Sequence, residues 1–273
     1  MVDIHKIAGI FPFINFFGYE VYTYAIFIGL AFVAASIIFL MFGTKYAHVL
    51  DLIELCFYLC VNSIIAAKIV FLISAIPDII ADPAYLNACI LEGGFTFAGG
   101  LVGGLLTGLF MCWRRRMSIP RVMSSFLMAT ALGHAILKVG CMYNGCCYGL
   151  EYEGLFAIAI EGVGSTFPIQ MIESITSLAI FVLLFVLFLK VEFKEESKVH
   201  IYFMLIYPVV KFIIEFFRGD AVRGVFILSM SQWLCIFIFA IGLIFGIHAL
   251  ATRPKKQASK VEYIKMKKPK TTE

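Results

Sequence analysis

Charged residues are scarce in this sequence. Asp, Glu, Lys and Arg make up 15% of its 273 residues, whereas soluble domains usually contain about 25%. Apolar residues reach 62%, and the mean hydropathy is +0.96. These values exclude an ordinary soluble domain and predict a polytopic membrane protein. No break in composition marks a second folded domain.

The sequence also lacks the features that are typical of transporters and of secretory signal peptides. The chain has no internal repeat and few ionisable residues in the middle of its apolar segments, which makes a transporter the less favoured class. A secretory signal peptide is not expected either. The first apolar stretch is too long, has no basic leader, and is not followed by a small-residue cleavage pattern.

Seven apolar segments are long enough to cross a bilayer, which requires about 20 residues each. We therefore expect an all-α fold, a seven-transmembrane-helix bundle within residues 1–250, followed by a basic cytoplasmic tail at 251–273. The predicted spans are residues 21–42, 53–76, 94–113, 121–141, 169–190, 199–217 and 226–250.

Lysine and arginine are distributed unevenly between the two sets of connections. Sixteen lie in the connections and tail on one side, and three lie on the other. Because short cytoplasmic loops carry the excess of these residues, we expect the N-terminus outside and the C-terminus in the cytoplasm. The turn at 142–168 and the RGDAVRG loop then lie on the outer side. The basic tail is interpreted as a topology determinant that touches anionic lipid, and nucleic-acid binding is not expected.

The segment HAILKVGCMYNGCCYG, residues 134–149, leads ionisable side chains out of an apolar stretch into a turn rich in glycine and cysteine. His134, Lys138 and Cys141 are spaced i, i+4, i+7, so a helix places them on one face. A cation inside a membrane span is costly and indicates a functional site. The segment therefore predicts a site for an anionic group such as a lipid headgroup.

The segment KFIIEFFRGD repeats this helical spacing with Lys211, Glu215 and Arg218. One interpretation is an internal ion pair between Lys211 and Glu215 that lowers the cost of burying both charges. That pair would leave Arg218 and Lys138 without a role. The other interpretation is that the set of charges binds an anionic ligand, and this is the one we favour.

Two further segments supply candidate residues. FPIQMIE opens the fifth span and places Gln170 and Glu173 on one helix face, where we expect them to be partners of the cations. GGFTFAGG contains Gly99 and Gly100, whose small size permits either close helix packing or approach of the backbone to a ligand.

Three of the eight cysteines, Cys141, Cys146 and Cys147, cluster at the outer end of the fourth span. Because disulfides persist outside the cytoplasm, a bridge within this cluster is one interpretation. A structural turn and a direct role in the site are the others. A zinc site is less favoured, since no nearby histidine or cysteine pair completes a tetrahedral set.

Taken together, these motifs resemble the prolipoprotein diacylglyceryl transferase family, especially members whose signature segment ends in GCCYG. The matching segments are VYTYAIFIG, GGFTFAGG, HAILKVGCMYNGCCYG, FPIQMIE, KFIIEFFRGDAVRG and SMSQW, which occur in the family's order. The resemblance covers most of the membrane region. It implies a multi-pass enzyme of the bacterial cytoplasmic (inner) membrane, with the seven-span topology expected above.

The reaction implied by the resemblance moves the diacylglyceryl group of phosphatidylglycerol to the lipobox cysteine of a prolipoprotein. The implied partners are phosphatidylglycerol, prolipoprotein signal peptides and membrane lipid, and no metal or diffusible cofactor is implied. The attacking thiol must be deprotonated or held in an electropositive setting. The departing phosphate requires cations that stabilise its charge.

The resemblance also implies roles for individual residues. Lys138, Lys211 and Arg218 would hold the phosphate, Glu215 would orient a cation, and Asn144 would hydrogen-bond the headgroup. The predicted catalytic residues are Lys138, Glu215, Tyr24 and His134, and the predicted substrate-binding residues are Lys211, Arg218, Asn144, Gly149, Gly99, Gly100, Gln170 and Glu173.

The sequence departs from the family pattern at several positions. Lys138 and Lys211 stand where the family usually has arginine, which keeps the charge but loses the planar fork that fits phosphate. Ala98 and Phe167 stand where many members have histidine, so His134 or Tyr24 becomes the candidate base. Two rival hypotheses follow from these departures: an enzyme with a different lipid donor or acceptor, and a lipid-binding protein without catalytic activity.

Overall fold

The computed structural model describes residues 13–16, 19–44, 47–83, 85–91, 97–160, 162–191, 198–220, 223–225 and 228–251. The described part of the chain is mostly helical, as the composition predicts. The expected cytoplasmic tail lies outside the described residues except for Ala251, and so does part of the RGDAVRG loop.

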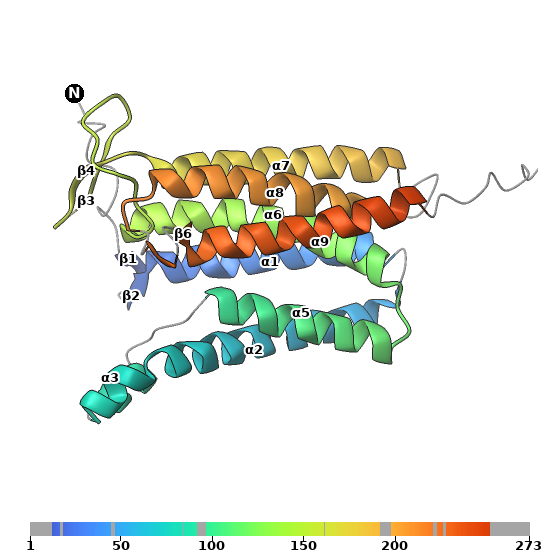
Figure 1. Ribbon diagram of the computed structural model, residues 1–273, viewed down its shortest axis with the longest axis horizontal. Coiled ribbons are helices and arrows are strands. Elements are labelled where there is room, and N and C mark those ends of the chain that lie inside the picture. Colours follow the sequence, from blue (N-terminus) through green and yellow to red (C-terminus); the bar gives the residue numbers. More distant parts are fainter. Residues whose placement is uncertain are drawn as a thin grey trace, which may run out of the picture.

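Five long helices lie side by side and form the main bundle (Figure 1). They are α1 (Thr23–Gly43), α6 (Ile119–Asn144), α7 (Ile169–Val191), α8 (Val199–Ile214) and α9 (Met230–Ala251). Helix α6 contacts α1, α7 and α8, while α9 packs against α8. A core of fully buried side chains, including Met128, Leu184 and Phe188, joins α6 and α7. This arrangement makes α6 the central helix of the bundle.

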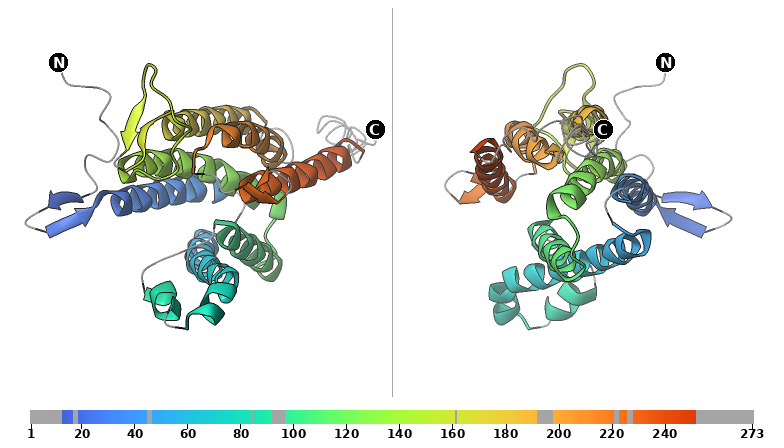
Figure 2. Two further views of the ribbon diagram at one scale, coloured as in Figure 1. Left: turned by 60° about the vertical axis from the view of Figure 1, so that its left-hand side comes forward. Right: turned by 90° about the vertical axis from the view of Figure 1, so that its right-hand side faces the viewer.

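A second group consists of α2 (Val49–Ser74) and α5 (Phe97–Arg114), with the short helices α3 (Ile76–Ala81) and α4 (Tyr85–Leu91) between them. The views in Figure 2 place this group beside the main bundle. A glycine at position 103 allows α2 and α5 to approach closely, because a Cβ atom there would lie 2.4 Å from the Cβ atom of Ala66. The glycine-rich segment therefore serves helix packing in this part of the fold.

Six helices in the described part of the chain are long and apolar enough to cross a membrane: α1, α2, α6, α7, α9, and α8 continued to Phe217. They correspond to six of the seven predicted spans, with ends that differ by a few residues. The remaining predicted span, 94–113, contains α5, an 18-residue helix that is not among the six. The chain is thus a multi-pass membrane protein.

The prediction of a helical fold is confirmed in the main, but the described residues also contain three two-stranded antiparallel hairpins. They pair β1 (Phe13–Phe16) with β2 (Tyr19–Tyr22), β3 (Ile158–Ile160) with β4 (Gly164–Thr166), and β5 (Arg223–Val225) with β6 (Leu228–Ser229). Each hairpin lies outside the helices. The backbone N–H and C=O groups there have no helical partners, so they pair with each other across the two strands. Figure 1 shows the hairpins gathered at one end of the bundle.

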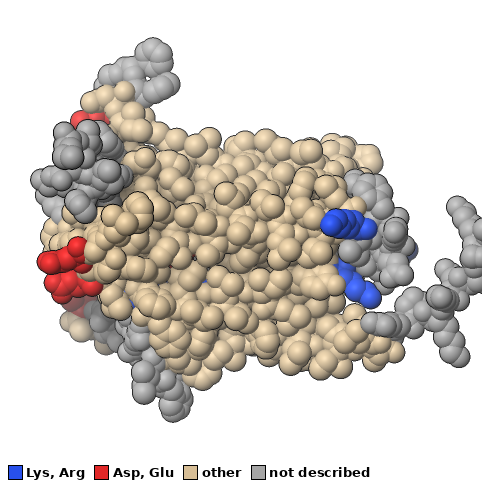
Figure 3. Space-filling model, turned by 90° about the horizontal axis from the view of Figure 1, so that it is seen from above, with Lys and Arg blue, Asp and Glu red and all other residues tan. Residues whose placement is uncertain are grey.

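The surface of the bundle reflects its apolar composition. On the face drawn in Figure 3, a broad region free of charged side chains separates acidic side chains at one end from basic side chains at the other. Such a region matches the hydrocarbon core of a bilayer, where charged side chains are costly. The helices therefore run from one membrane surface to the other.

Candidate functional site

Five charged side chains of alternating sign meet inside the end of the bundle that carries the hairpins. The chain begins with Lys138 on α6, continues through Glu173 on α7 and Lys211 on α8, and ends with Glu215 and Arg218 just beyond α8. Three segments that are far apart in the sequence therefore converge at one place. The five side chains are called the charge chain below.

Glu173 is the centre of the charge chain. Its two carboxylate oxygens form separate ion pairs, one with the ammonium group of Lys138 and one with that of Lys211. The Glu173 side chain is only 1% exposed. A buried carboxylate of this kind is stable only when it is paired and hydrogen-bonded, and the two lysines provide this pairing.

Glu215 continues the charge chain from Lys211 to Arg218. Its Oε2 atom lies 3.1 Å from the Lys211 ammonium nitrogen and 3.6 Å from a guanidinium nitrogen of Arg218. Its Oε1 atom accepts a hydrogen bond of 3.0 Å from the hydroxyl of Ser229. The interpretation that Lys211 and Glu215 form an internal ion pair is confirmed, but Lys138 and Arg218 also have acidic partners.

The sequence did not reveal how Ser229 reaches Glu215, although the signal was present in SMSQW. Ser229 and Gln232 form a capping box at the start of α9: the backbone N–H of Gln232 donates to the Ser229 hydroxyl at 3.2 Å, and that of Ser229 donates to the Gln232 side chain at 2.9 Å. The S-x-x-Q spacing is the sequence signature of this motif. The cap of α9 thus also orients a carboxylate of the site.

Arg218 is not part of the helix that carries Lys211, contrary to the expected i, i+7 spacing. Helix α8 ends at Ile214 and continues as a 3-10 turn, η2 (Glu215–Phe217), after which Arg218 adopts an extended conformation. The chain leaves the helix because Arg218 pairs with Gly149 in an antiparallel bridge. That pairing is between distant segments and cannot be read from local spacing.

The Arg218 side chain turns to Asp220, a partner that sequence reasoning missed. Its Nε and Nη2 atoms donate to the two carboxylate oxygens at 2.9 and 3.0 Å. Burial alone would lower the pKa of Arg218, but these hydrogen bonds and the nearby Cys147 and Glu215 outweigh it, so the pKa lies above its ordinary value. Arg218 is therefore a permanent cation that is held in one orientation.

Gly149 holds two chain segments together beside Arg218. A Cβ atom at this position would lie 2.4 Å from the backbone oxygen of Phe167, and one at Gly219 would lie 2.3 Å from the backbone oxygen of Gly149. The backbone N–H of Gly219 donates to the carbonyl of Tyr148 at 2.9 Å. The glycine that ends the signature segment thus permits the close approach that positions Arg218.

His134 lies one helical turn before Lys138, as the spacing predicts. Its Nδ1 atom is 2.8 Å from the hydroxyl of Ser177 on α7, and its ring meets that of Tyr207 edge-on. These residues line a small pocket together with Glu173 and Lys211. The structure therefore brings His134 to the charge chain, with its ring orientation set by Ser177.

Gln170 lies one turn before Glu173 and is fully buried. Its side-chain N–H donates to the carbonyl of Cys146 at 3.0 Å. Its Oε1 atom has no hydrogen-bond partner among the described residues. A buried acceptor of this kind is costly to leave unpaired, so it offers a position for a hydroxyl donor.

The remaining predicted residues divide between the two helix groups. Asn144 accepts a hydrogen bond from the hydroxyl of Tyr22, and the hydroxyl of Tyr24 lies beside the thiol of Cys141. Both therefore lie at the end of α6 near the charge chain. Gly99 and Gly100 lie instead on α5, where a Cβ atom on Gly100 would contact Ser63 and Ala67 of α2. That contact is helix packing.

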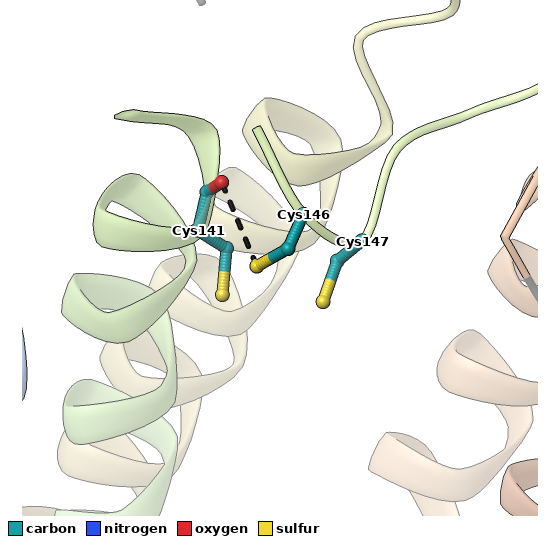
Figure 4. Close-up of side chains that lie close together, drawn as sticks. All are labelled: Cys141, Cys146 and Cys147. Carbon is teal, nitrogen blue, oxygen red and sulfur yellow. Dashed lines mark hydrogen bonds between the residues drawn. The ribbon is translucent and has the colours of Figure 1, made fainter. Parts of the chain in front are cut away.

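The cysteines Cys141, Cys146 and Cys147 form a compact group, called the thiol cluster below. Their three sulfur atoms all lie within 4.8 Å of one another, and Figure 4 shows them facing the same space at the end of α6. All three are free thiols in this structure, so the disulfide, one of the interpretations of this cluster, is not formed. Cys146 and Cys147 are half-buried and Cys141 is buried.

The end of α6 explains why the three thiols meet. Gly145 adopts a left-handed conformation with φ of 68°, and the backbone N–H of Cys146 donates to the carbonyl of Cys141 at 3.2 Å. This is the Schellman arrangement that reverses the chain over the last helical turn. It places Cys146 above Cys141, which no i, i+5 spacing within a straight helix would do.

Cys147 is held in a conformation that side chains rarely adopt. Its φ of 59° lies in the left-handed region, which costs a non-glycine residue about 1 kcal/mol or more. Its pKa is lowered, because the Cys141 and Cys146 thiols hydrogen-bond to it and the charges of Lys138 and Arg218 lie nearby. The thiol cluster and the charge chain therefore adjoin each other.

Comparison with known proteins identifies the family of this chain. The family model for prolipoprotein diacylglyceryl transferase matches residues 12–248. The chain belongs to this family and is an enzyme of the transferase class, as the motifs in the sequence predict.

Curated relatives match most of the chain. The phosphatidylglycerol–prolipoprotein diacylglyceryl transferase 2 of Clostridium perfringens is 30% identical over 247 residues, which is 87% of this chain and 94% of the relative. The corresponding transferase of Clostridium tetani is 27% identical over a match that covers 83% of this chain and 92% of the relative. The transferase of Geobacter sulfurreducens is 26% identical over a match that covers 71% of this chain and 76% of the relative.

Proposed function

We propose that this protein transfers the diacylglyceryl group of phosphatidylglycerol to the cysteine thiol of the lipobox in prolipoproteins. The reaction takes place in the bacterial cytoplasmic membrane, at the end of the bundle where the charge chain lies. Family membership supports the reaction type. The observation that carries the choice of site is the buried charge chain, which joins three helices at one membrane surface.

The charge chain offers three cations to one phosphodiester. Lys138, Lys211 and Arg218 alternate with the carboxylates of Glu173 and Glu215, and Arg218 also pairs with Asp220, so the site carries as many carboxylates as cations. Phosphatidylglycerol carries one negative charge on its phosphate. The phosphate therefore binds by sharing these fixed cations with the carboxylates, and not by neutralising a surplus charge.

The same cations serve the leaving group. When the thiolate attacks the glyceryl carbon, the bond from that carbon to the phosphate oxygen breaks and glycerol phosphate departs with a second negative charge. Cations fixed before the reaction stabilise charge that develops in the transition state. Glu173 and Glu215 hold Lys138, Lys211 and Arg218 in place, and a lysine supplies this charge without the two-pronged contact of an arginine.

The unpaired acceptor of Gln170 fits the headgroup of phosphatidylglycerol. A glycerol hydroxyl can donate to Oε1, and the hydrogen bond from Gln170 to the Cys146 carbonyl holds the amide in the orientation this requires. A site that hydrogen-bonds a substrate hydroxyl rejects an analogue lacking it, because the buried group is then left unpaired. Gln170 would therefore select phosphatidylglycerol over phosphatidate, while Asn144 approaches the headgroup from α6.

The proposed orientation places this site on the outer side of the membrane, with the N-terminus outside and residues 251–273 in the cytoplasm. Basic side chains at the opposite end support it, since Arg115 lies near the start of α2, and Lys190 ends α7. A C-terminal fusion tests the orientation. Green fluorescent protein should fluoresce and alkaline phosphatase should be inactive when fused after Glu273, and the reverse pattern would contradict it.

The function is tested with purified protein in detergent, phosphatidylglycerol and a lipobox peptide, with the product identified by mass spectrometry. We expect a thioether-linked diacylglyceryl peptide. A peptide with serine in place of the lipobox cysteine should give none. Lys138→Ala should lose product, because it removes a cation from the phosphate and leaves Glu173 with one partner fewer.

The matched control for that variant is Lys190→Ala, which removes an exposed lysine at the end of α7. It should keep full activity. If well-folded wild-type protein binds phosphatidylglycerol but forms no product, the protein has a different acceptor or no catalytic activity. If Lys138→Ala and Lys190→Ala retain equal activity, the charge chain does not hold the phosphate.

A further inference from the structure

The thiol cluster presents three sulfur atoms in an arrangement that the proposed function has not used. Within the described residues, Cys141, Cys146 and Cys147 form a group in which each residue can offer one ligand atom, all within 4.8 Å of one another. Zinc binds thiolate sulfur at about 2.3 Å, which places tetrahedral ligand sulfurs about 3.8 Å apart. Side-chain movements that shift the sulfur atoms by about 1 Å would bring them to this separation.

The backbone is built to keep the three sulfurs together. The reversal at Gly145 stacks Cys146 over Cys141, and the left-handed conformation of Cys147 turns its side chain back to the same point. A residue other than glycine keeps a strained backbone conformation only where the surrounding structure requires it, and such residues concentrate at functional sites.

The surroundings of the thiol cluster suit a negatively charged metal–thiolate group. Three thiolates and one divalent zinc ion carry one net negative charge. The cations Lys138 and Arg218 lie near the cluster, and the Tyr24 hydroxyl lies beside the thiol of Cys141. Cations next to a thiol favour its thiolate form, which is the form that binds a metal.

We propose that Cys141, Cys146 and Cys147 form a tris-thiolate zinc site whose open fourth position takes the acceptor thiol. The inference rests on the proposed function, and it identifies the group that activates the nucleophile. Three protein ligands with one open position are the pattern of catalytic zinc sites, whereas structural sites have four. Zinc is favoured over copper(I), another metal that thiolates select, because alkyl transfer to sulfur involves no change of oxidation state.

The chemistry of this step is balanced without any further reactant. The lipobox thiol binds zinc through sulfur and loses its proton to solvent, since a coordinating thiol is deprotonated outright. The sulfur lone pair then attacks the terminal glyceryl carbon. A carbon–sulfur bond forms, the carbon–oxygen bond to phosphate breaks, and the bonding pair leaves with glycerol phosphate. The product is a neutral thioether, a weaker zinc ligand than the thiolate it replaces.

The location of the thiol cluster fits this role. Cys141 is buried, whereas Cys146 and Cys147 are half-buried, so the accessible side of the cluster is that of the turn. The carbonyl of Cys146 accepts the hydrogen bond from Gln170, one helical turn from Glu173. The proposed acceptor position and the proposed phosphate position are therefore neighbours, which a direct displacement requires.

The first test measures metal content and needs no activity. The full-length protein is purified in detergent without chelator or an affinity column charged with metal, and its metals are measured by mass spectrometry. We expect about one zinc ion per chain, and at least about tenfold less in Cys141→Ser, Cys146→Ser and Cys147→Ser. Cys60→Ser, on α2, is the matched control and should retain the wild-type content. Wild-type protein that neither carries zinc nor acquires it from a zinc buffer overturns the proposal.

The second test examines the open position directly. Cobalt(II) replaces zinc and reports thiolate ligands through sulfur-to-cobalt charge-transfer absorption. We expect this absorption to increase when a lipobox peptide is added and to remain unchanged with the peptide whose cysteine is replaced by serine. An unchanged spectrum with both peptides overturns the role of the fourth position, and this measurement does not depend on any cysteine variant folding.

Activity separates this proposal from the proposed function. Removing zinc with a chelator should reduce thioether formation about a hundredfold, as loss of a nucleophile-activating group does, and added zinc should restore it. Full transfer by metal-free protein overturns the zinc role and leaves the transferase function intact. Zinc bound by the three cysteines without transfer to any lipobox peptide supports the site and contradicts the proposed function.

Discussion

Lys138 and Glu173 form an ion pair between α6 and α7 in which the side chains are only 7% and 1% exposed. The pair joins the signature segment to the segment FPIQMIE, and Glu173 extends it to Lys211 on α8. Removing one member of such a pair leaves a buried charge without compensation, which is more harmful than removing both. The predictions below follow from this and from the contacts around it.

Glu173→Gln should destabilise the protein and abolish transfer. It leaves Lys138 and Lys211 without their shared carboxylate, at a cost of about 3–5 kcal/mol. Thermal unfolding in detergent should show a clear decrease in Tm. Glu153→Gln, an exposed position in the connection between α6 and α7, is the control and should leave Tm unchanged. The double variant Lys138→Met with Glu173→Gln should recover part of the lost stability, and failure to recover any would contradict the pairing.

Gly149→Ala should displace Arg218. The added Cβ atom would lie 2.4 Å from the backbone oxygen of Phe167, which cannot rotate away as a side chain can. Overpacking of this kind costs about 1–3 kcal/mol, and the shift of the Gly149–Arg218 bridge should also raise KM for phosphatidylglycerol. Gly29→Ala, where no atom lies within 4 Å, should be neutral or slightly stabilising. Equal behaviour of the two variants would show that the bridge tolerates movement.

Gln170→Leu should weaken the selection of the lipid headgroup. The amide is replaced by an apolar side chain of similar size, so the proposed contact with a glycerol hydroxyl is lost. We expect the ratio of kcat/KM for phosphatidylglycerol to that for phosphatidate to decrease about tenfold, the size of one hydrogen bond. An unchanged ratio, with activity retained, would exclude Gln170 from headgroup recognition.

Ser229→Ala should affect both stability and catalysis through two different partners. The hydroxyl caps α9 and also donates to Glu215, and loss of an N-terminal cap costs about 1 kcal/mol. Ser118 begins α6 but makes no side-chain capping hydrogen bond. Ser118→Ala should therefore leave both Tm and kcat near the wild-type values, whereas Ser229→Ala should lower both. A decrease in Tm alone would show that Glu215 is oriented without Ser229.

Local spacing predicted the parts of the site that one helix contains. His134, Lys138 and Cys141 share a face because α6 runs without interruption to Asn144, and apolar length predicted six spans within a few residues. The Schellman turn could also have been anticipated from the Asn–Gly pair that follows. These features depend only on residues that are close in the sequence.

Features that depend on distant segments could not be predicted in the same way. Arg218 leaves the helix because Gly149 offers an antiparallel bridge, and its partner Asp220 becomes available only once it has done so. The role of Glu173 as the shared partner of two lysines depends on how α7 packs between α6 and α8. Helix packing is set by the whole bundle, so the sequence predicted that Glu173 is a partner of the cations but not that it joins two lysines on two other helices.

The alternation of charges along α6, α7 and α8 also has a consequence for how the protein enters the membrane. The helices α6, α7 and α8 are synthesised in this order and carry Lys138, Glu173 and Lys211 respectively. Each must pass through the insertion machinery with an ionisable side chain. A charge at the centre of an isolated helix costs about 2.5–3.5 kcal/mol, and less towards its end. Each newly made helix supplies the counter-ion of the one before it, so biogenesis favours retention of α6 beside the translocon until α7 and α8 arrive.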